Sequence, residues 1–120
     1  AIDYRVQDFL AEAKRLTDGK GVNVVLDMVG GPYIQRNIAA RAVEGRLVQI
    51  AFLQGPKVTL NLVEMMTRRL VLTGSTLRPQ SDLAKARIAA AVKAEVWPMV
   101  QRGALKVVMD SEFALRDAAE

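Results

Sequence analysis

The sequence predicts an α/β fold, a parallel sheet with helices on both sides, from two observations. Three short apolar runs rich in β-branched residues lie at positions 22–26, 47–51 and 70–73. Their near-continuous apolarity indicates strands buried on both faces. Segments with helical spacing precede, separate and follow these runs. Such an alternation buries its apolar surfaces best when parallel strands pair and helices cover them.

Apolar spacing predicts two helices in the first third of the chain. The first covers residues 6–16, with Asp8 near its start and Gly19 suited to the left-handed position beyond its end. The second covers residues 32–43, where Pro32 suits the first turn. Its inward stripe recurs every four residues, at Ile34, Ile38 and Ala42. Before them, Ile2 is expected to end an earlier strand.

Capping residues predict the next two helices. At residues 61–69, Asn61 is expected to cap the helix and Glu64 to reach back to it, as in a capping box. A longer helix begins after Ser81, is interrupted near Trp97 and Pro98, and is closed by Gly103.

The last part of the chain predicts one more strand and the beginning of a helix. Lys106 to Asp110 forms the strand, and Phe113 to Glu120 follows a helical pattern without a stop signal. Because the chain opens on the tail of a strand and closes within a helix, we expect it to be a piece of a longer protein.

Composition narrows the class of protein. The 120 residues are 51% hydrophobic, enough for one globular domain with a single core. The chain has no cysteine and no histidine, which excludes disulfides, thiolate zinc sites and histidine-based triads. The net charge of +4 is scattered and no recognition motif accompanies it, so no nucleic-acid partner is expected. No apolar stretch suits a membrane span, and a cytoplasmic protein is expected.

Ligands of open parallel sheets bind beyond the carboxyl ends of the strands, which directs attention to three segments. Residues 27–31 contain paired glycines that serve either a close ligand or a plain turn. Residues 52–56 offer Phe52 as a wall for a flat ring or as a core side chain. Residues 74–79 carry hydroxyls and Arg78, which suit a carboxamide and an anion, or equally a turn and a solvated surface.

A missing motif is equally informative. A dinucleotide-binding domain needs a glycine-rich turn between its first strand and first helix, where amides and the helix dipole hold the pyrophosphate. No Gly-x-Gly-x-x-Gly occurs in this sequence.

Three stretches resemble quinone oxidoreductases of the medium-chain dehydrogenase/reductase superfamily. They are Gly-Lys-Gly-Val-Asn-Val-Val-Leu-Asp-Met-Val-Gly-Gly at 19–31, Gly-Arg-Leu-Val-Gln-Ile-Ala-Phe-Leu at 45–53 and Leu-Thr-Gly-Ser-Thr-Leu-Arg at 72–78. The resemblance implies that residues 1–120 are a truncated nucleotide-binding domain, a partial Rossmann-type parallel sheet. Its first two strands, its glycine-rich motif and the catalytic domain would be absent from this chain.

The same resemblance implies a chemistry and a cofactor site. The parent would transfer a hydride from NADPH to a quinone or similar electrophilic acceptor, without zinc, while the fragment alone is expected to be inactive. No residue of the chain is expected to be catalytic. The implied cofactor contacts are Met28, Val29 and Gly30 on the adenosine and ribose side, Phe52 and Leu53 near the nicotinamide, and Ser75, Thr76 and Leu77 beside them.

Two sheet edges imply oligomers. In the family the last edge strand pairs with its twin, which would place residues 70–73 at a two-fold axis. With strands 1 and 2 of the order 3-2-1-4-5-6 missing, the edge at residues 22–26 also lacks a neighbour. We therefore expect a homodimer or higher oligomer through exposed sheet edges, with a second copy or a rearranged terminal strand covering residues 22–26.

Three alternatives remain. A receiver-type signalling domain phosphorylated on Asp27 matches in length and in an aspartate at a strand end, but the chain lacks the acidic pair and late lysine of such a domain. The second alternative is that the isolated chain is a structural fragment that has no catalytic activity and binds no ligand. A relative of zinc-dependent alcohol dehydrogenases would share the architecture, although residues 74–78 favour the quinone-reductase branch.

Overall fold

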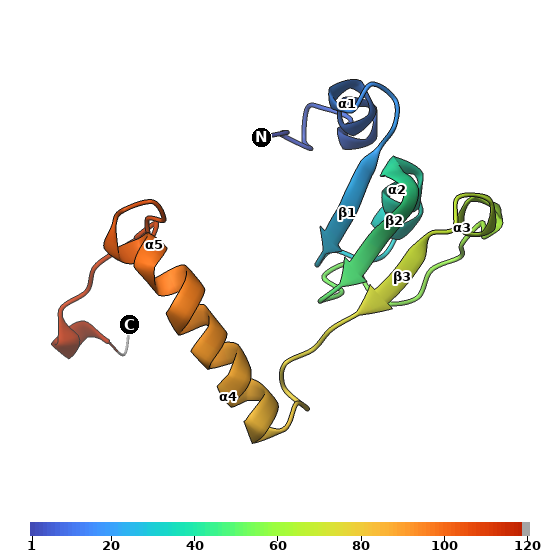
Figure 1. Ribbon diagram of the computed structural model, residues 1–120. Helices are drawn as coiled ribbons and strands as arrows, with labels where there is room; N and C mark the ends of the chain where they lie inside the picture. The colour runs from blue at the N-terminus through green and yellow to red at the C-terminus, as the bar shows by residue number, and fades with distance from the viewer. Residues whose placement is uncertain (119–120) are drawn as a thin grey trace. The chain divides into compact units, whose positions relative to one another are not determined.

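The computed structural model describes residues 1–118, which form two compact units (Figure 1). The N-terminal unit is Ala1–Thr76 and contains the sheet. The C-terminal unit begins at Leu77 and is helical. Each unit is described by itself below.

The N-terminal unit holds a three-stranded parallel sheet, as the sequence predicts. Its strands are β1 (Val22–Asp27), β2 (Arg41–Gln49) and β3 (Val71–Gly74), in the order β1-β2-β3. The pairing of β1 and β2 is interrupted, because Val22 lies opposite Arg41 but Val24 lies opposite Arg46. The regular part of β2 therefore begins at Arg46, close to the predicted start of the second strand.

Three helices accompany the sheet: α1 (Phe9–Leu16), α2 (Tyr33–Ala40) and α3 (Val63–Thr67). The predicted first cap is confirmed, since the carboxylate of Asp8 accepts from the N–H groups of Leu10 and Ala11. Gly19 is left-handed at φ +77°, as predicted. Two residues of the predicted stripe supply the core, in which Ile34 and Ile38 pack with Leu70, and the partly buried Leu60 and Met65 pack against them. The third, Ala42, lies in β2, because the helix ends at Ala40 and not at residue 43.

The helices of this unit cover one face of the sheet. Leu47 and Gln49 are buried beneath α2. Val24 and Leu26 point to the opposite face and are 63% and 61% exposed. The expected burial on both faces is therefore wrong for β1 in the described residues, because the helices cover only the face opposite Val24 and Leu26.

The predicted capping box at α3 is wrong in part. The side-chain oxygen of Asn61 accepts from the N–H of Val63 at 3.0 Å, but the N-cap residue of α3 is Leu62, whose side chain caps nothing. Glu64 does not reach back, because its carboxylate pairs with Arg68 one turn later. An available arginine at i+4 competes for the carboxylate and wins here.

The C-terminal unit confirms the predicted interrupted helix. The helix α4 (Asp82–Ala91) begins after Ser81, whose hydroxyl accepts from the N–H of Ala84 at 3.2 Å. It continues through a π-helical stretch, η1 (Val92–Val96), into α5 (Trp97–Gln101). Gly103 follows at φ +73°.

Three expected elements are absent from the described residues. Lys106 to Asp110 does not form a strand, and Ile2 does not end one. The helix expected from Phe113 is only the 3-10 turn η2 (Leu115–Asp117), while Ala119 and Glu120 lie outside the described residues. Strand propensity alone does not form a strand, because its hydrogen bonds require a neighbour.

Candidate functional site

The three strands end at one edge of the sheet. Asp27 lies opposite Gln49, and Gln49 lies opposite Gly74, at the last positions of β1, β2 and β3. The three segments that the sequence identifies as ligand candidates therefore leave the sheet side by side. The N–H of Ser75 continues the pairing by donating to the carbonyl of Gln49 at 3.0 Å.

The segments after β1 and β2 are joined by backbone hydrogen bonds. The N–H of Leu53 donates to the carbonyl of Met28 at 3.1 Å, and that of Gln54 to the carbonyl of Val29 at 2.7 Å. Gly31 donates in return to the carbonyl of Gly55 at 2.9 Å. The structure thus brings together the predicted cofactor contacts Met28, Val29 and Gly30 with Phe52 and Leu53.

The paired glycines serve this junction. Gly30 lies at φ +70° and Gly31 at φ +54°, where L side chains are rarely found. A Cβ atom on Gly31 would lie 2.7 Å from the carbonyl oxygen of Gln54. The sequence left open whether these glycines make room for a ligand or for a turn. In the structure, the backbone that approaches them closely is the segment after β2, residues 52–55.

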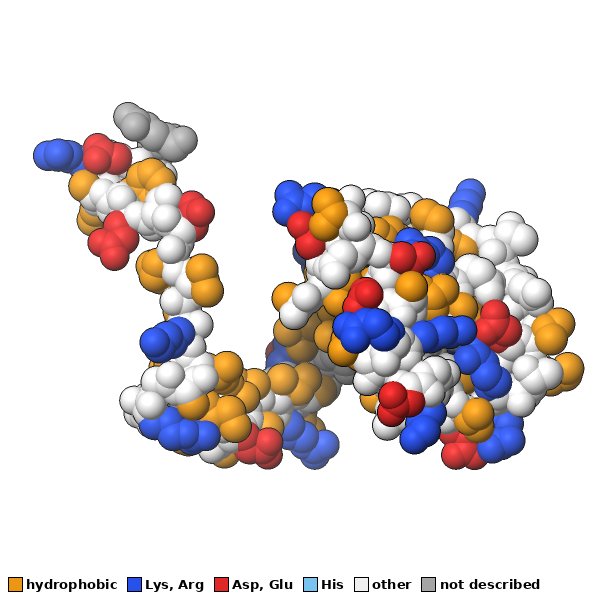
Figure 2. Space-filling view, turned by 90° about the horizontal axis from the view of Figure 1, so that it is seen from above, with side chains coloured by type: hydrophobic (Ala, Val, Ile, Leu, Met, Phe, Trp, Pro, Cys, Tyr) orange, Lys and Arg blue, Asp and Glu red, His pale blue; other side chains and the backbone are white. Residues whose placement is uncertain are grey.

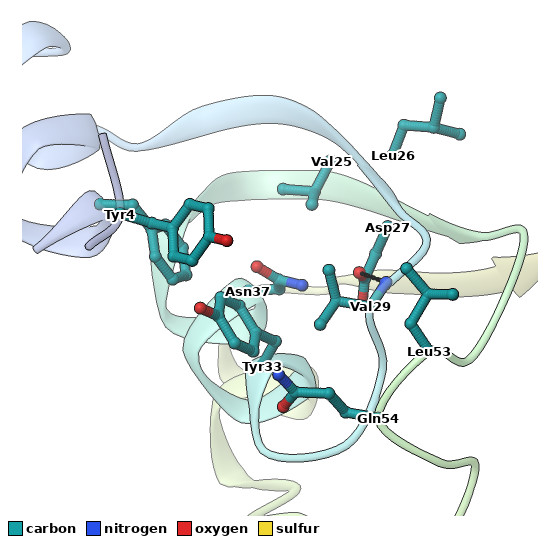
Figure 3. A pocket seen from close by; sticks show the side chains of 10 residues that line it. Tyr4, Val25, Leu26, Asp27, Val29, Tyr33, Asn37, Leu53 and Gln54 are labelled. Atoms are coloured by element: carbon teal, nitrogen blue, oxygen red, sulfur yellow. Dashed lines mark hydrogen bonds between the residues drawn. The ribbon is translucent and has the colours of Figure 1, made fainter. Parts of the chain in front are cut away.

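Asp27 fixes the turn that carries the predicted contacts. It is 4% exposed, and its carboxylate accepts from the N–H of Val29 at 2.6 Å and from that of Gly30 at 3.3 Å (Figure 3). This carboxylate therefore holds Val29 and Gly30 in place. The turn accounts for an aspartate at the strand end without phosphorylation of Asp27.

A pocket of about 380 Å³ opens beside this turn (Figure 3). Its apolar walls include Phe9, Val25, Val29 and Leu53. Its polar groups are Asp27, Gln54 and side chains that the sequence did not single out, namely Tyr4, Tyr33 and Asn37. The predicted contacts Val29 and Leu53 thus form one rim of a larger concave surface.

Asn37 is the most informative of these side chains. The residue is 6% exposed, but its amide atoms are not among the fully buried polar atoms without a hydrogen-bond partner, which in the described residues are Nε of Arg41 and Oε1 of Gln49. The amide therefore stays accessible from the pocket, where it can donate and accept hydrogen bonds. In Figure 3 it lies within the pocket, between Tyr4 and Val29.

Helical geometry places the pocket residues of α2. Tyr33 and Asn37 are four residues apart and share a face, next to the stripe of Ile34 and Ile38. Tyr33 stacks on Phe9 of α1 with ring centroids 5.6 Å apart. The four-residue spacing of Tyr33 and Asn37 beside an apolar stripe is the feature of the sequence that could have indicated their common face.

Arg36 ties α1 to α2 through the rings of Phe9 and Tyr33. Its guanidinium lies 4.5 Å from the ring centroid of Phe9 and pairs with the carboxylate of Asp8 at 2.7 Å. The carboxylate also caps α1, so its pKa is lowered, first by the N–H groups of Ala11 and Leu10 and then by Arg36. One aspartate thus positions both the helix and the aromatic wall.

The remaining predicted contacts are divided between the units. Ser75 and Thr76 end the N-terminal unit, whereas Leu77 begins the C-terminal unit. Met28, Phe52 and Leu53 are all substantially exposed. They are therefore available to a flat apolar ligand at the carboxyl edge of the sheet.

Residues 1–118 contain no group of three or more acidic, cysteine or histidine side chains placed to hold a metal ion. In the same residues, no helix is both long and apolar enough to cross a membrane.

Comparison with known proteins identifies the family. A family model described as zinc-binding dehydrogenase matches residues 1–120. The chain is 30% identical over 119 residues to a quinone oxidoreductase of Pseudomonas aeruginosa. That match covers 98% of this chain and 36% of the relative, so the chain spans about a third of that protein.

Solved structures share the fold. The quinone oxidoreductase of Escherichia coli complexed with NADPH is 25% identical with a TM-score of 0.70, covering 91% of this chain and 33% of that one. An NAD-dependent alcohol dehydrogenase is 31% identical with a TM-score of 0.68, covering 89% and 28%. The predicted resemblance and the Rossmann-type sheet are confirmed.

Proposed function

The chain belongs to the zinc-binding dehydrogenase family, and from this premise we propose that it supplies part of the cofactor site of an oxidoreductase. The reaction we propose is hydride transfer from NADPH to a quinone or similar electrophilic acceptor. The 120 residues alone are proposed to be inactive, and a cytoplasmic location goes with this proposal.

The junction of the segments after β1 and β2 is the observation that carries the proposal. It holds Met28, Val29 and Leu53 in one continuous backbone arrangement where parallel sheets bind ligands. Because hydrogen bonds fix both segments, Val29 and Leu53 form a prepared apolar part of the pocket, and Met28 and Phe52 next to them in the chain are exposed. Such a surface orients a flat ring without ordering a loop on binding.

The residues present fit one part of the cofactor and not another. Apolar side chains beside exposed polar groups suit the rings and riboses of a dinucleotide. The diphosphate needs a glycine-rich turn at a helix start. The space beside Gly30 and Gly31 is already filled by residues 52–55. We therefore assign ring contacts to this chain and no role in holding phosphate.

Within the proposed mechanism this chain orients and shields. The reduced nicotinamide, when bound, supplies the hydride, so no side chain here needs to be an acid, base or nucleophile. Phe52 and Leu53 would cover the ring and exclude water from the transfer, while Asp27 keeps Val29 and Gly30 in register. Ser75, Thr76 and Leu77 are proposed as further contacts, partly through the main chain.

NADPH rather than NADH is the finer part of the proposal. It rests on the family resemblance and on the Escherichia coli quinone oxidoreductase, which was solved with NADPH. The NAD-dependent alcohol dehydrogenase with the same fold makes NADH the necessary comparison. The acceptor class rests likewise on the quinone oxidoreductases among the relatives.

A titration and a chimera test the proposal together. NADPH is added to the 120-residue chain, with NADH and the Pseudomonas aeruginosa relative as controls, and nicotinamide fluorescence is recorded. We expect binding by the relative and none by the chain. This chain then replaces the matching 119 residues of the relative, and we expect the chimera to bind NADPH and oxidise it with benzoquinone.

Substitutions in the chimera locate the site. Leu53→Asn removes an exposed apolar contact and should weaken NADPH binding about tenfold, equivalent to ~1.4 kcal/mol. Val6→Asn changes an exposed residue outside the pocket and should leave binding unchanged. A folded chimera that does not bind NADPH, or one in which both substitutions behave alike, would contradict the proposal.

A further inference from the structure

Gln49 is a buried polar residue at the carboxyl end of β2, the central strand of the sheet. It lies opposite Asp27 of β1 and Gly74 of β3, and it is 8% exposed. Its Nε2 donates to the carbonyl of Ala51 at 2.6 Å. Its Oε1 is buried as well and has no hydrogen-bond partner in the described residues. The amide is therefore only half satisfied, at the edge where the ligand candidates leave the sheet.

A half-satisfied buried amide is unfavourable for stability. An oxygen that loses water without gaining a hydrogen bond raises the free energy of the folded state, and an apolar side chain of similar length would avoid this. Leu47, on the same strand and the same face, shows that alternative, because it is apolar and fully buried. Exceptions to such a rule are expected at functional sites. What Gln49 adds is its one hydrogen bond, to Ala51.

The bond to Ala51 lies between two backbone anchors of the segment after β2. Before it, the N–H of Ile50 donates to the last residue of β1 at 2.9 Å. After it, the N–H of Leu53 donates to the segment that follows β1 at 3.1 Å. The amide of Gln49 holds the carbonyl that lies between these anchors. It thereby fixes the direction in which the chain leaves β2 and carries Phe52.

Packing alone does not fix Phe52. Figure 2 shows apolar side chains at the surface of the molecule, and those of Phe52 and Leu53 are 48% and 76% exposed. A second pocket, of about 420 Å³, adjoins Phe52 and is lined also by Ile34, Gln49 and Gly74. Gly74 has no side chain to fill it. Because the ring of Phe52 has room to move, the hydrogen bonds of its segment decide where it lies.

We propose that Gln49 is a positioning residue of the cofactor site, whose amide holds the Ala51 carbonyl and through it the wall of Phe52 and Leu53. The inference rests on the proposed function, in which that wall covers the nicotinamide. It requires stability and cofactor binding to respond differently to one substitution. Gln49→Met has a similar length but neither the donor nor the unpaired oxygen, so the fold should tolerate it while the wall loses its support.

Amide hydrogen exchange in the 120-residue chain tests the local step without a cofactor. Gln49→Met should leave the urea midpoint equal or higher, while the N–H groups of Leu53 and Gln54 exchange about tenfold faster. Leu47→Met is the matched control, a buried residue of the same strand and face, and should leave that exchange unchanged. Unchanged exchange in Gln49→Met overturns the proposal. A lower midpoint also overturns it, because Gln49 would then serve stability.

The chimera with the Pseudomonas aeruginosa relative tests the functional step. Gln49→Met should weaken NADPH binding about tenfold. At saturating NADPH it should also slow the oxidation by benzoquinone about tenfold, because hydride transfer depends on how the ring is held. Leu47→Met should change neither value. An unsubstituted chimera that does not bind NADPH overturns the proposed function and this inference with it. A chimera that binds NADPH and is indifferent to Gln49→Met overturns this inference alone.

Discussion

A Cβ atom added to Gly30 would lie 2.9 Å from Cδ1 of Phe52. Gly30 is also left-handed, at φ +70°. Two separate physical reasons therefore require glycine at this position, one in the backbone and one in the packing of the second segment. The same contact joins two residues for which the family resemblance implies different sides of the cofactor.

Gly30→Ala should destabilise the fold more than a glycine substitution that meets only the backbone requirement. We expect a loss of about 2–4 kcal/mol, from the left-handed φ and from the overlap with Phe52 and with the carbonyl oxygen of Gly55, each 2.9 Å from the added Cβ. Gly55 provides the control, because it lies at φ +92° with open space around it. Gly55→Ala should lose about 1–2 kcal/mol. Equal losses in urea denaturation would show that the close contacts of Gly30 with Phe52 and with the carbonyl of Gly55 contribute nothing.

Removing the Asp27 carboxylate should loosen the turn after β1. Asp27→Ala leaves two N–H groups without their acceptor and should lower the free energy of unfolding by about 1–3 kcal/mol. Asp27→Asn retains an acceptor oxygen and should lose less. The measurement is urea unfolding followed by circular dichroism. If the asparagine and alanine variants lose the same amount, the hydrogen bonds to Val29 and Gly30 are not the reason for this aspartate.

Local rules predicted much of the fold, and the errors have different causes. Spacing and caps located α2, the start of α4 after Ser81 and the interruption near Trp97, because those features depend on nearby residues. The strand expected at Lys106 to Asp110 failed, because a strand needs a distant partner that spacing does not reveal. The back-reaching Glu64 failed because Arg68 competes for it.

The sequence indicated the strand-end segments of the candidate site but not the side chains that the packing of α1 and α2 adds to it. The position after each strand led to residues 27–31 and 52–56, since parallel strands end at one edge, and the family resemblance implied Val29, Phe52 and Leu53 within them. Tyr4 and Asn37 were missed, because the pocket forms only when α1 and α2 pack together. That packing depends on Arg36 and on ring stacking, which no strand-end rule includes.

Asp8 should make the free energy of unfolding of the N-terminal unit depend on pH in the acid range. Its pKa is lowered in the folded chain, mainly by the capped N–H groups of Ala11 and Leu10. A lowered pKa means that this stabilisation is complete above the usual aspartate value, about pH 4, and is lost as the pH falls through the folded value. Urea unfolding at about pH 6 and about pH 3 measures the loss.

Asp8→Asn provides the comparison for that loss. Asparagine keeps a capping oxygen but does not titrate, so its difference between the two pH values should be smaller than for the unsubstituted chain. Other carboxylates contribute equally to both proteins and cancel in the comparison. An identical pH dependence in the two proteins would contradict a role for the Asp8 charge.

Arg41 is a buried cation that forms no salt bridge with a carboxylate of the described residues. Its side chain is fully buried, one Nη donates to the carbonyl of Val71 at 2.7 Å, and Nε has no partner. Burial lowers its pKa, and the nearby charge of Arg68 lowers it further, while Glu64 acts in the other direction. The folded chain therefore keeps this cation at a desolvation penalty.

Replacing Arg41 by an apolar side chain of similar length should therefore be tolerated. Arg41→Met removes the buried charge and keeps most of the packing, so we expect a change within about 1 kcal/mol. Arg41→Ala leaves a cavity as well and should lose about 2–4 kcal/mol. Urea midpoints of the two variants decide between packing and hydrogen bonding. If methionine is as damaging as alanine, the bond to the Val71 carbonyl carries the stability and the volume of the side chain does not.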